Sequence, residues 1–110
     1  MAYTPDFTPD ILTPARTEVD AMPGPVVLEF GTGWCGHCRG AQPLIEQALG
    51  GYPHVQHLKI EDGPGRPLGR SFRVKLWPTL VFMRDGQVQA QIVRPTDTQG
   101  LNDALRQITA

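Results

Sequence analysis

Two cysteines in one short stretch are the residues of this chain whose types and spacing most directly suggest chemistry. Cys35 and Cys38 are the only cysteines among 110 residues, and they lie in the stretch EFGTGWCGHCRGAQP (29–43). An apolar strand-like run precedes them and a helical pattern follows, which places both thiols in the first turn of a helix. There, unpaired backbone N–H groups and the positive end of the helix dipole favour a thiolate at Cys35. The i, i+3 spacing puts both sulfurs on one face, so the pair can form and break a disulfide with little backbone motion.

Two other uses of a cysteine pair are weaker. As a structural staple it would close a very small ring, which constrains the unfolded chain little. As half of a zinc site it would need two more ligands. The only histidines are His37, His54 and His57, and there is no second cysteine pair. Because His37 lies between the cysteines, it could hardly join both on one tetrahedral ion, and we expect no metal.

The pattern along the rest of the chain predicts one domain, 13–110, after an irregular arm, 1–12, that contains two prolines. Thr13 as N-cap and Pro14 as first helical position predict a short helix that ends at about residue 21. Helical spacing predicts helices at 38–49 and 98–108, and the stretch 66–74 is interpreted as a loop that leads into a short helix. Apolar runs predict strands at 26–30 and 55–60. Two further strands within 79–93 flank Asp85-Gly86, a good hairpin signal. This order implies a central mixed sheet, parallel where a helix crosses over and antiparallel at the hairpin, with helices on its faces.

Charge and composition exclude some partners. Ten basic and eleven acidic residues give a net charge of −1, and no basic block suggests a nucleic acid or an anionic membrane. The first 20 residues show neither a signal-peptide pattern nor a span long enough for a bilayer. We therefore expect a cytoplasmic protein.

Several separated motifs together resemble the thioredoxin superfamily over residues 26–108. Trp34-Cys35-Gly36-His37-Cys38 resembles the Trp-Cys-Gly-x-Cys centre of that family, and Pro43 matches the proline that kinks its active-site helix. Trp77-Pro78-Thr79 matches the loop with a cis-proline, and Arg84-Asp85-Gly86 lies where the family turns its hairpin. The resemblance implies a thioredoxin-like α/β fold with a central mixed sheet of four to five strands.

The resemblance also implies a thiol–disulfide oxidoreductase that reduces protein disulfides. Cys35 would be the nucleophile and Cys38 the resolving thiol, with no bound cofactor. Electrons would come from a donor such as thioredoxin reductase or glutathione. We expect a monomer whose roles are electron transport and cell redox homeostasis. Two alternatives stay open: a disulfide oxidase or isomerase on the same centre, and a binding or assembly module on the same scaffold.

The residues around the loop with the predicted cis-proline are expected to bind the client. A cis bond at Pro78 would leave the backbone N–H and C=O of Trp77 for an extended client chain. Trp34 and Thr79 are assigned to the same surface, although either tryptophan could be a simple core residue. Arg94 stands where the family usually carries a glycine, so it would narrow the groove or select acidic partners.

Glu29 is unusual, because it lies among apolar residues six positions before Cys35, where the family has a buried carboxylate. Such a group could accept the proton of Cys38 when that thiol attacks the mixed disulfide. His57 stands where a lysine usually approaches the carboxylate, although a surface histidine is an equal expectation. We expect Glu29→Gln to stabilise the protein, because the substitution removes an ionisable group from an apolar site. A loss of stability would instead mean that the carboxylate is a satisfied structural group, for example one paired with His57.

His37 gives the centre the Gly-His dipeptide of protein disulfide isomerase. An imidazole beside Cys35 would favour its thiolate, which stabilises the reduced form and makes the disulfide more oxidising. We expect a potential between about −270 mV, typical of thioredoxin, and about −180 mV, typical of protein disulfide isomerase.

Overall fold

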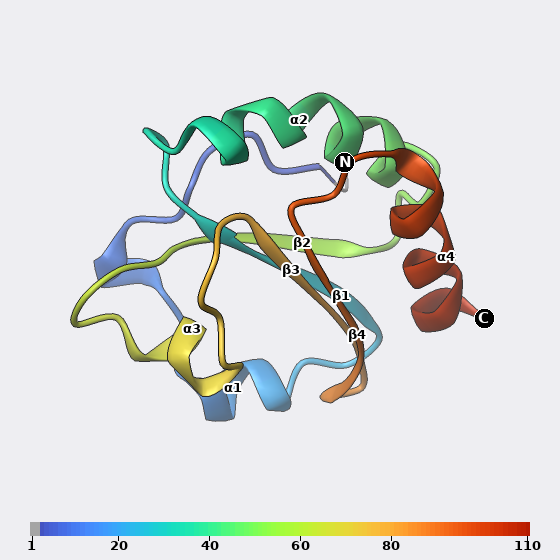
Figure 1. Ribbon diagram of the computed structural model, residues 1–110. Coiled ribbons are helices and arrows are strands. Elements are labelled where there is room, and N and C mark those ends of the chain that lie inside the picture. Colours follow the sequence, from blue (N-terminus) through green and yellow to red (C-terminus); the bar gives the residue numbers. More distant parts are fainter. Residues whose placement is uncertain (1–2) are drawn as a thin grey trace.

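Four strands form one mixed sheet in the part of the chain that the computed structural model describes, residues 3–110 (Figure 1). They are β1 (Pro25–Gly31), β2 (Gln56–Glu61), β3 (Thr79–Arg84) and β4 (Gln87–Val93), in the spatial order β2-β1-β3-β4. β1 pairs parallel with β2 and antiparallel with β3, and β3 pairs antiparallel with β4. The predicted α/β class with a mixed sheet is confirmed. Residues 1 and 2 of the predicted arm lie outside the described residues.

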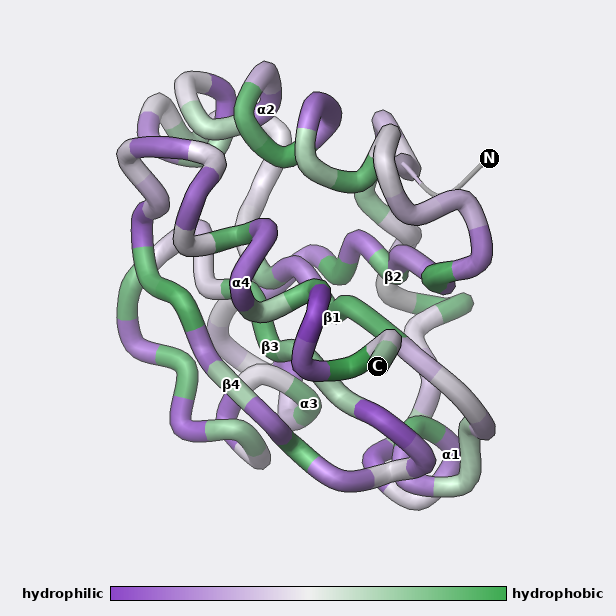
Figure 2. The backbone as a smooth tube through the Cα atoms, turned by 90° about the vertical axis from the view of Figure 1, so that its right-hand side faces the viewer, coloured by the Kyte–Doolittle hydropathy of each residue, from purple (hydrophilic) through white to green (hydrophobic). Residues whose placement is uncertain are grey.

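Helices cover both faces of the sheet (Figure 1). α2 (Gly36–Leu49) and α4 (Thr98–Thr109) lie on one face, and α1 (Arg16–Asp20) and α3 (Pro67–Ser71) lie on the other, after a 3-10 helix at Asp10–Leu12. Hydrophobic positions recur along α2 and α4 between hydrophilic ones (Figure 2), as expected for helices with one buried face. Each face of the sheet therefore has its own apolar core.

The pleat of β1 decides which core each of its side chains enters. Val27 packs in the core under α2 and α4, whereas Val26 and Leu28 pack in the core on the other face. Because side chains alternate along a strand, Glu29 points to the same face as Val27, beneath α2. On β2, His57 pairs with Val27 and Lys59 with Glu29, so both side chains share that face.

The helix predicted at 13–21 is shorter than expected, with α1 at Arg16–Asp20. The prediction that Thr13 caps this helix is wrong. Its Oγ1 donates instead to the carbonyl of Pro9 at 3.4 Å. Ala15 is the N-cap, and its backbone N–H donates to the Glu18 carboxylate at 3.0 Å. A carboxylate three residues into a helix can satisfy that amide without a hydroxyl at the cap.

The hairpin between β3 and β4 turns at Asp85 and Gly86, as predicted. Both residues have positive φ, 50° and 80°, which is the requirement of the two-residue turn that matches strand twist. A Cβ at Gly86 would collide with the backbone oxygen of Asp20, so this turn also needs glycine for a close approach. The Asp85 carboxylate accepts the N–H of Gly24 at 2.6 Å, which ties the turn to the start of β1.

The segment 3–8 runs along β2 and beneath α2 (Figure 1). Thr8 forms a parallel bridge to Ile60, and its N–H donates to the carbonyl of Lys59 at 2.7 Å. Side chains and backbone groups of this segment therefore fill part of the space between β2 and α2. Within residues 3–110, no helix combines the length and the apolar character needed to cross a membrane.

Candidate active site

Cys35 is the N-cap of α2. Its backbone is extended, with φ −75° and ψ 122°, and its Sγ accepts the backbone N–H of Cys38 at 3.3 Å. The sulfur thus occupies the place that a serine or aspartate oxygen usually fills at a helix start. Both cysteines are free thiols, and Cys35 retains 8% of its surface in contact with solvent whereas Cys38 retains 1%. Both residues are thus largely buried, and Cys35 is the more accessible of the two.

Cys38 is held in its protonated form. Burial is the largest of the effects that raise the pKa of its thiol from 9.0 to about 12, followed by its hydrogen bond to Cys35. The charges of Cys35 and Glu29 act in the same direction, and the backbone N–H of Thr32 opposes them. Cys38 can therefore become a nucleophile near neutral pH only if a neighbouring group takes its proton.

Gly31, the last residue of β1, makes room for the Cys38 sulfur. A Cβ on Gly31 would lie 2.5 Å from Cys38 Sγ and 3.3 Å from Cζ of Phe7. Any side chain at this position would displace the resolving sulfur or the N-terminal segment beside it. Sequence reasoning did not identify Gly31 as a site residue.

Glu29 is fully buried, and both of its carboxylate oxygens have partners. Oε1 lies 3.0 Å from Nε2 of His57, and Oε2 accepts a hydrogen bond from Nε2 of Gln42 at 2.8 Å. His57 is 5% exposed, so the alternative of a surface histidine is wrong. The pleat explains the contact, because β2 presents His57 on the same face of the sheet as Glu29.

The N-terminal segment fixes the tautomer of His57. The backbone N–H of Thr4 donates to Nδ1 at 2.8 Å, so Nδ1 must be an acceptor. The proton of the neutral ring therefore sits on Nε2, from which it is donated to Glu29. Tyr3 stacks on the imidazole with ring centroids 5.6 Å apart, which holds the ring plane in place.

Gln42 connects Glu29 to the active-site helix. Its Nε2 donates both to Glu29 and to the backbone carbonyl of Cys38, at 2.8 and 2.7 Å. Its Oε1 accepts from the hydroxyl of Tyr3 and from Nζ of Lys59, each at 2.7 Å. With two donors on its oxygen and two acceptors on its nitrogen, the amide has one favourable orientation.

Lys59 is a buried cation at the edge of this network. It is 2% exposed, and its Nζ donates to the carbonyl of Pro5 as well as to Gln42. The ammonium also lies 4.8 Å from the ring centroid of Phe7, within range of a cation–π interaction. We call Tyr3, Glu29, Gln42, His57 and Lys59, with the Thr4 amide, the Glu29 network.

The loop before β3 contains the expected cis bond, between Trp77 and Pro78. The two tryptophans lie edge to face with ring centroids 5.7 Å apart, and Trp34 is 75% exposed. Trp34 is therefore not a core residue. The indole N–H of Trp77 donates to the carboxylate of Asp62 at 2.9 Å, so this ring has a fixed position. Pro78 itself is buried.

The other residues assigned to client binding lie in different settings. Thr79 is 1% exposed, and its hydroxyl donates to the carbonyl of Leu76, so its side chain supports the loop. Arg94 is exposed, and its Nε donates to the carbonyl of Trp77 at 2.9 Å. His37 and Arg94 line one groove beside the start of α2. The structure thus brings His37 and Arg94 to one groove at the start of α2 and the two tryptophans together, and it leaves Thr79 inside.

Pro43 lies inside α2 and is exposed. It cannot donate a hydrogen bond to the turn before it, which is the physical basis of the predicted bend. Among the described residues, no three His, Cys, Asp or Glu side chains gather where they could hold a metal ion.

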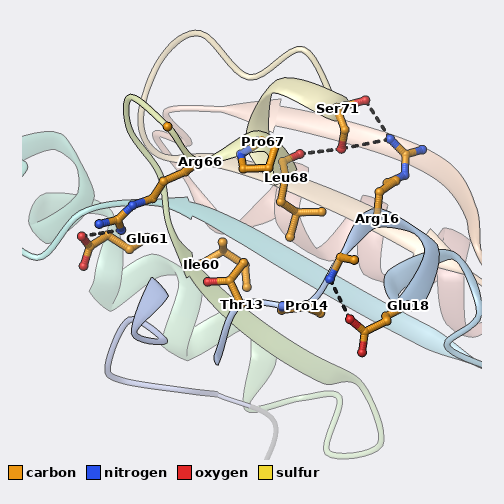
Figure 3. Close-up of a pocket in the computed structure, with 13 residues that line it drawn as sticks. Thr13, Pro14, Arg16, Glu18, Ile60, Glu61, Arg66, Pro67, Leu68 and Ser71 are labelled. Atoms are coloured by element: carbon orange, nitrogen blue, oxygen red, sulfur yellow. Dashed lines mark hydrogen bonds and ion pairs between the residues drawn. The ribbon is translucent and has the colours of Figure 1, made fainter. Parts of the chain in front are cut away.

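A cavity of about 450 Å³ lies away from this site, between α1, the end of β2 and α3 (Figure 3). Arg66 pairs with Glu61 at 2.6 Å, and Arg16 donates to the carbonyl of Ser71 at 2.7 Å. Neither cysteine lines this cavity, and its charged groups have protein partners. We assign no part of the chemistry to it.

Sequence reasoning also missed five other residues of the site, namely Tyr3, Thr4, Gln42 and Lys59 of the Glu29 network and Asp62, which holds Trp77. For two of them, spacing in the sequence could have indicated their position. Gln42 lies four residues after Cys38 and so shares its helix face, and Lys59 alternates with His57 on one strand face. The contacts of the N-terminal segment have no comparable signal, because an irregular segment has no periodicity from which to read a face.

Comparison with known proteins places the chain among thioredoxins. The thioredoxin family model matches residues 12–107. The structure of thioredoxin 2 from Pseudomonas aeruginosa PAO1 in its reduced form has a TM-score of 0.79 at 51% identity, covering 98% of this chain and 94% of that chain. Thioredoxin from Chlamydia pneumoniae is 30% identical over 74% of this chain and 80% of its own length.

One relative is much longer than this chain. The peptide-N(4)-(N-acetyl-beta-glucosaminyl)asparagine amidase of Caenorhabditis elegans is 28% identical over 82 residues, which are 74% of this chain but only 13% of that protein. The likeness is to one part of a larger protein, and the amidase activity in its name is not carried over.

Proposed function

This chain belongs to the thioredoxin family and is a thiol–disulfide oxidoreductase, and we propose that it works as a reductase of protein disulfides in which Cys35 attacks and Cys38 resolves. The observation that carries this assignment is the asymmetry of the two sulfurs. Cys35 is the more exposed and caps a helix, whereas Cys38 is buried with its pKa raised to about 12. An attacking thiol must be accessible, and a resolving thiol must wait until the mixed disulfide has formed.

The first step transfers one sulfur bond. The Cys35 thiolate attacks a sulfur of the client disulfide, a Cys35–client disulfide forms, and the other client sulfur leaves as a thiolate that takes a proton from solvent. Of the two client sulfurs, the one with the more stable thiolate is the better leaving group. No group beyond the two proteins is needed in this step.

The second step uses the Glu29 network. Cys38 gives its proton to the Glu29 carboxylate, and its sulfur attacks Cys35, so that the Cys35–Cys38 disulfide forms as the bond between Cys35 and the client breaks. The second client sulfur leaves as a thiolate that takes a proton from solvent, and Glu29 returns its proton to solvent. Two electrons have then passed from the chain to the client. Gln42 supports this role because it joins Glu29 to the Cys38 backbone, and His57 supports it by holding the second carboxylate oxygen.

The oxidised chain must be reduced before it can act again. We propose thioredoxin reductase or glutathione as the electron donor, in a cytoplasmic compartment where thiols are kept reduced. We also propose that the chain acts as a monomer, because one chain supplies both cysteines and Glu29. Fractionation of cells and light scattering of the purified chain test the compartment and the oligomeric state.

An insulin-reduction assay tests the proposed direction. The chain should accelerate precipitation of insulin with NADPH and thioredoxin reductase, or with reduced glutathione, and Cys35→Ser should abolish this. Cys38→Ser should stop turnover after the mixed disulfide has formed. A chain that folds but does not reduce insulin with either donor would contradict the proposal.

His37 favours one second candidate, a disulfide isomerase or oxidase. The imidazole stands between the cysteines and lines the open groove beside Cys35. A group that stabilises the reduced dithiol makes the disulfide a stronger oxidant. This alternative would be supported if the chain restored the activity of scrambled ribonuclease at a higher rate than it reduced insulin.

A further inference from the structure

Arg94 makes two contacts with the loop that carries the cis bond. Its backbone N–H donates to the carbonyl of Pro78 and its side-chain Nε donates to the carbonyl of Trp77, each at 2.9 Å. Its φ is 50°, in the left-handed region that costs a residue with a side chain some conformational energy. The position of Arg94 is therefore held by these contacts and not by backbone preference.

The side chain occupies a backbone acceptor on the surface around Cys35. Trp77 is fixed through its ring by Asp62, and its ring meets that of Trp34, the residue before Cys35. Its carbonyl is thus held at a defined place on this surface. A client chain that pairs with this edge needs a backbone acceptor for its own N–H, and Arg94 already uses the one that Trp77 offers.

The groove next to Arg94 has a permanently charged cation and no acidic residue in its lining. It has a volume of about 640 Å³ and is lined by Gly36, His37, Gly40 and Ala41 of α2 and by Arg94, Pro95 and Thr96 after β4. None of these seven residues is acidic. Two glycines and an alanine leave room for a chain, while Arg94 and His37 supply the basic side chains among the lining residues. A groove with this lining fits a peptide that carries negative charge.

We propose that Arg94 is a carboxylate receptor that selects clients with an acidic residue beside the cysteine attacked by Cys35. In the free chain the guanidinium rests on the Trp77 carbonyl. When a client brings a carboxylate, the guanidinium binds it as a fork, and the Trp77 carbonyl is free to accept the client's backbone N–H. This inference rests on the proposed function, because it presumes that Cys35 attacks protein disulfides.

The exchange is favourable for a physical reason. A single hydrogen bond from the guanidinium to an uncharged carbonyl is replaced by a two-pronged one to a carboxylate, in which both partners are charged, and a backbone bond to the client is gained. Because Arg94 is exposed, solvent screens the gain, and we expect the modest preference of a surface ion pair, about five-fold. The preference should shrink as ionic strength rises.

Matched peptides test this selection. Three peptides with one intramolecular disulfide should differ only in the residue next to the attacked cysteine: Glu, Gln or Lys. The kcat/KM of the chain is measured for each with the same reductant. We expect the Glu peptide to exceed the Gln peptide about five-fold at low salt and the Lys peptide to be poorest.

Variants of Arg94 assign the preference to this residue. Arg94→Gln should bring the Glu:Gln ratio close to one, and Arg94→Lys should keep part of it, since a lysine retains the charge but not the fork. Arg106→Gln, which removes the same charge from an exposed position on α4, is the control and should leave the ratio unchanged. A ratio unaffected by Arg94→Gln, or reduced equally by Arg106→Gln, overturns the proposal.

Two further measurements keep the outcomes distinct. If Arg94→Gln does not fold, Arg94→Gly, which tolerates the positive φ, replaces it. In the wild-type chain, equal rates for the Glu and Lys peptides at low salt also overturn the proposal. If the wild-type chain reduces insulin but shows no preference for the Glu peptide over the Gln peptide, only the inference about Arg94 is wrong. If it turns over neither insulin nor any of the peptides, the proposed function itself is wrong.

Discussion

Glu29→Gln removes one charge from the Glu29 network while nearly keeping the shape of the side chain. In the wild-type chain both carboxylate oxygens face donors, Nε2 of His57 at 3.0 Å and Nε2 of Gln42 at 2.8 Å. A glutamine keeps one oxygen and turns an amide NH₂ toward the other donor. One donor must then face another donor in a buried place.

The surroundings prevent an easy rearrangement. His57 cannot move its proton to Nδ1 without opposing the backbone N–H of Thr4, which donates to Nδ1 at 2.8 Å. Gln42 cannot turn its amide over without losing the hydrogen bonds that Tyr3 and Lys59 donate to its oxygen. The mismatch therefore stays in either orientation of the new side chain.

The expected loss of stability follows from these contacts. A buried donor without an acceptor costs about 1–3 kcal/mol, and a hydrogen bond to a charged group is worth about 1.5–3 kcal/mol. Relief from burying a carboxylate offsets part of this. We expect the free energy of unfolding of the oxidised form to fall by about 2 kcal/mol. The stabilisation expected for an unpartnered carboxylate does not apply, because the structure gives Glu29 two partners.

The same change should separate the two chemical steps. Attack by Cys35 on a client should be nearly unchanged, whereas release of the mixed disulfide by Cys38 should slow by about 100-fold or more, because the proton acceptor is gone. Stopped-flow measurement resolves the two steps, and urea denaturation of the oxidised form gives the stability. Glu46→Gln, the same substitution at an exposed position of α2, is the matched control.

Either half of this reasoning can fail separately. Release kinetics equal to those of the wild type would remove Glu29 from the mechanism. A variant as stable as the wild type, or more stable, would refute the argument that two donors oppose each other.

Three further outcomes are expected. Limiting iodoacetamide near neutral pH should label Cys35 before Cys38, because Cys35 is the more exposed and the Cys38 pKa is about 12; preferential labelling of Cys38 would reverse the assignment. His37→Pro should lower the redox potential by about 30 mV or more, measured against glutathione, which is about tenfold in the equilibrium constant, and an unchanged potential would show that His37 does not set it. The reduced form should lose stability as pH rises from about 9 to about 12. Burial is the main cause that raises the pKa of Cys38 from 9.0 to about 12 and that of Tyr3 from 10.0 to about 12. In this range the folded state therefore keeps protons that the unfolded chain releases. Denaturation of Cys38→Ala across this range should show a shallower decline, and an equal one would exclude Cys38 as a source.

Features that depend on neighbours in sequence could be predicted well. The spacing of Cys35 and Cys38 at the start of a helical pattern predicts two thiols at a helix N-terminus, and the structure has Cys35 as the N-cap of α2 with Cys38 in its first turn. Asp85-Gly86 predicts a two-residue turn, because few residues tolerate positive φ at both positions. Burial of Glu29 follows from the apolar strand around it. In each case the physical cause lies within a few residues.

The partners of these residues could not be read in the same way. Glu29 meets Gln42 from a helix and His57 from the next strand, and the Thr4 amide that fixes the imidazole comes from 53 residues away in the sequence. The sequence by itself thus determined the reactive sulfur pair, the buried carboxylate and the mixed sheet. Only the tertiary structure decided that this carboxylate is satisfied and that Arg94 rests on the Trp77 carbonyl. Periodicity and capping fix where a side chain points along its own element, whereas a hydrogen bond between elements depends on how distant segments pack against one another.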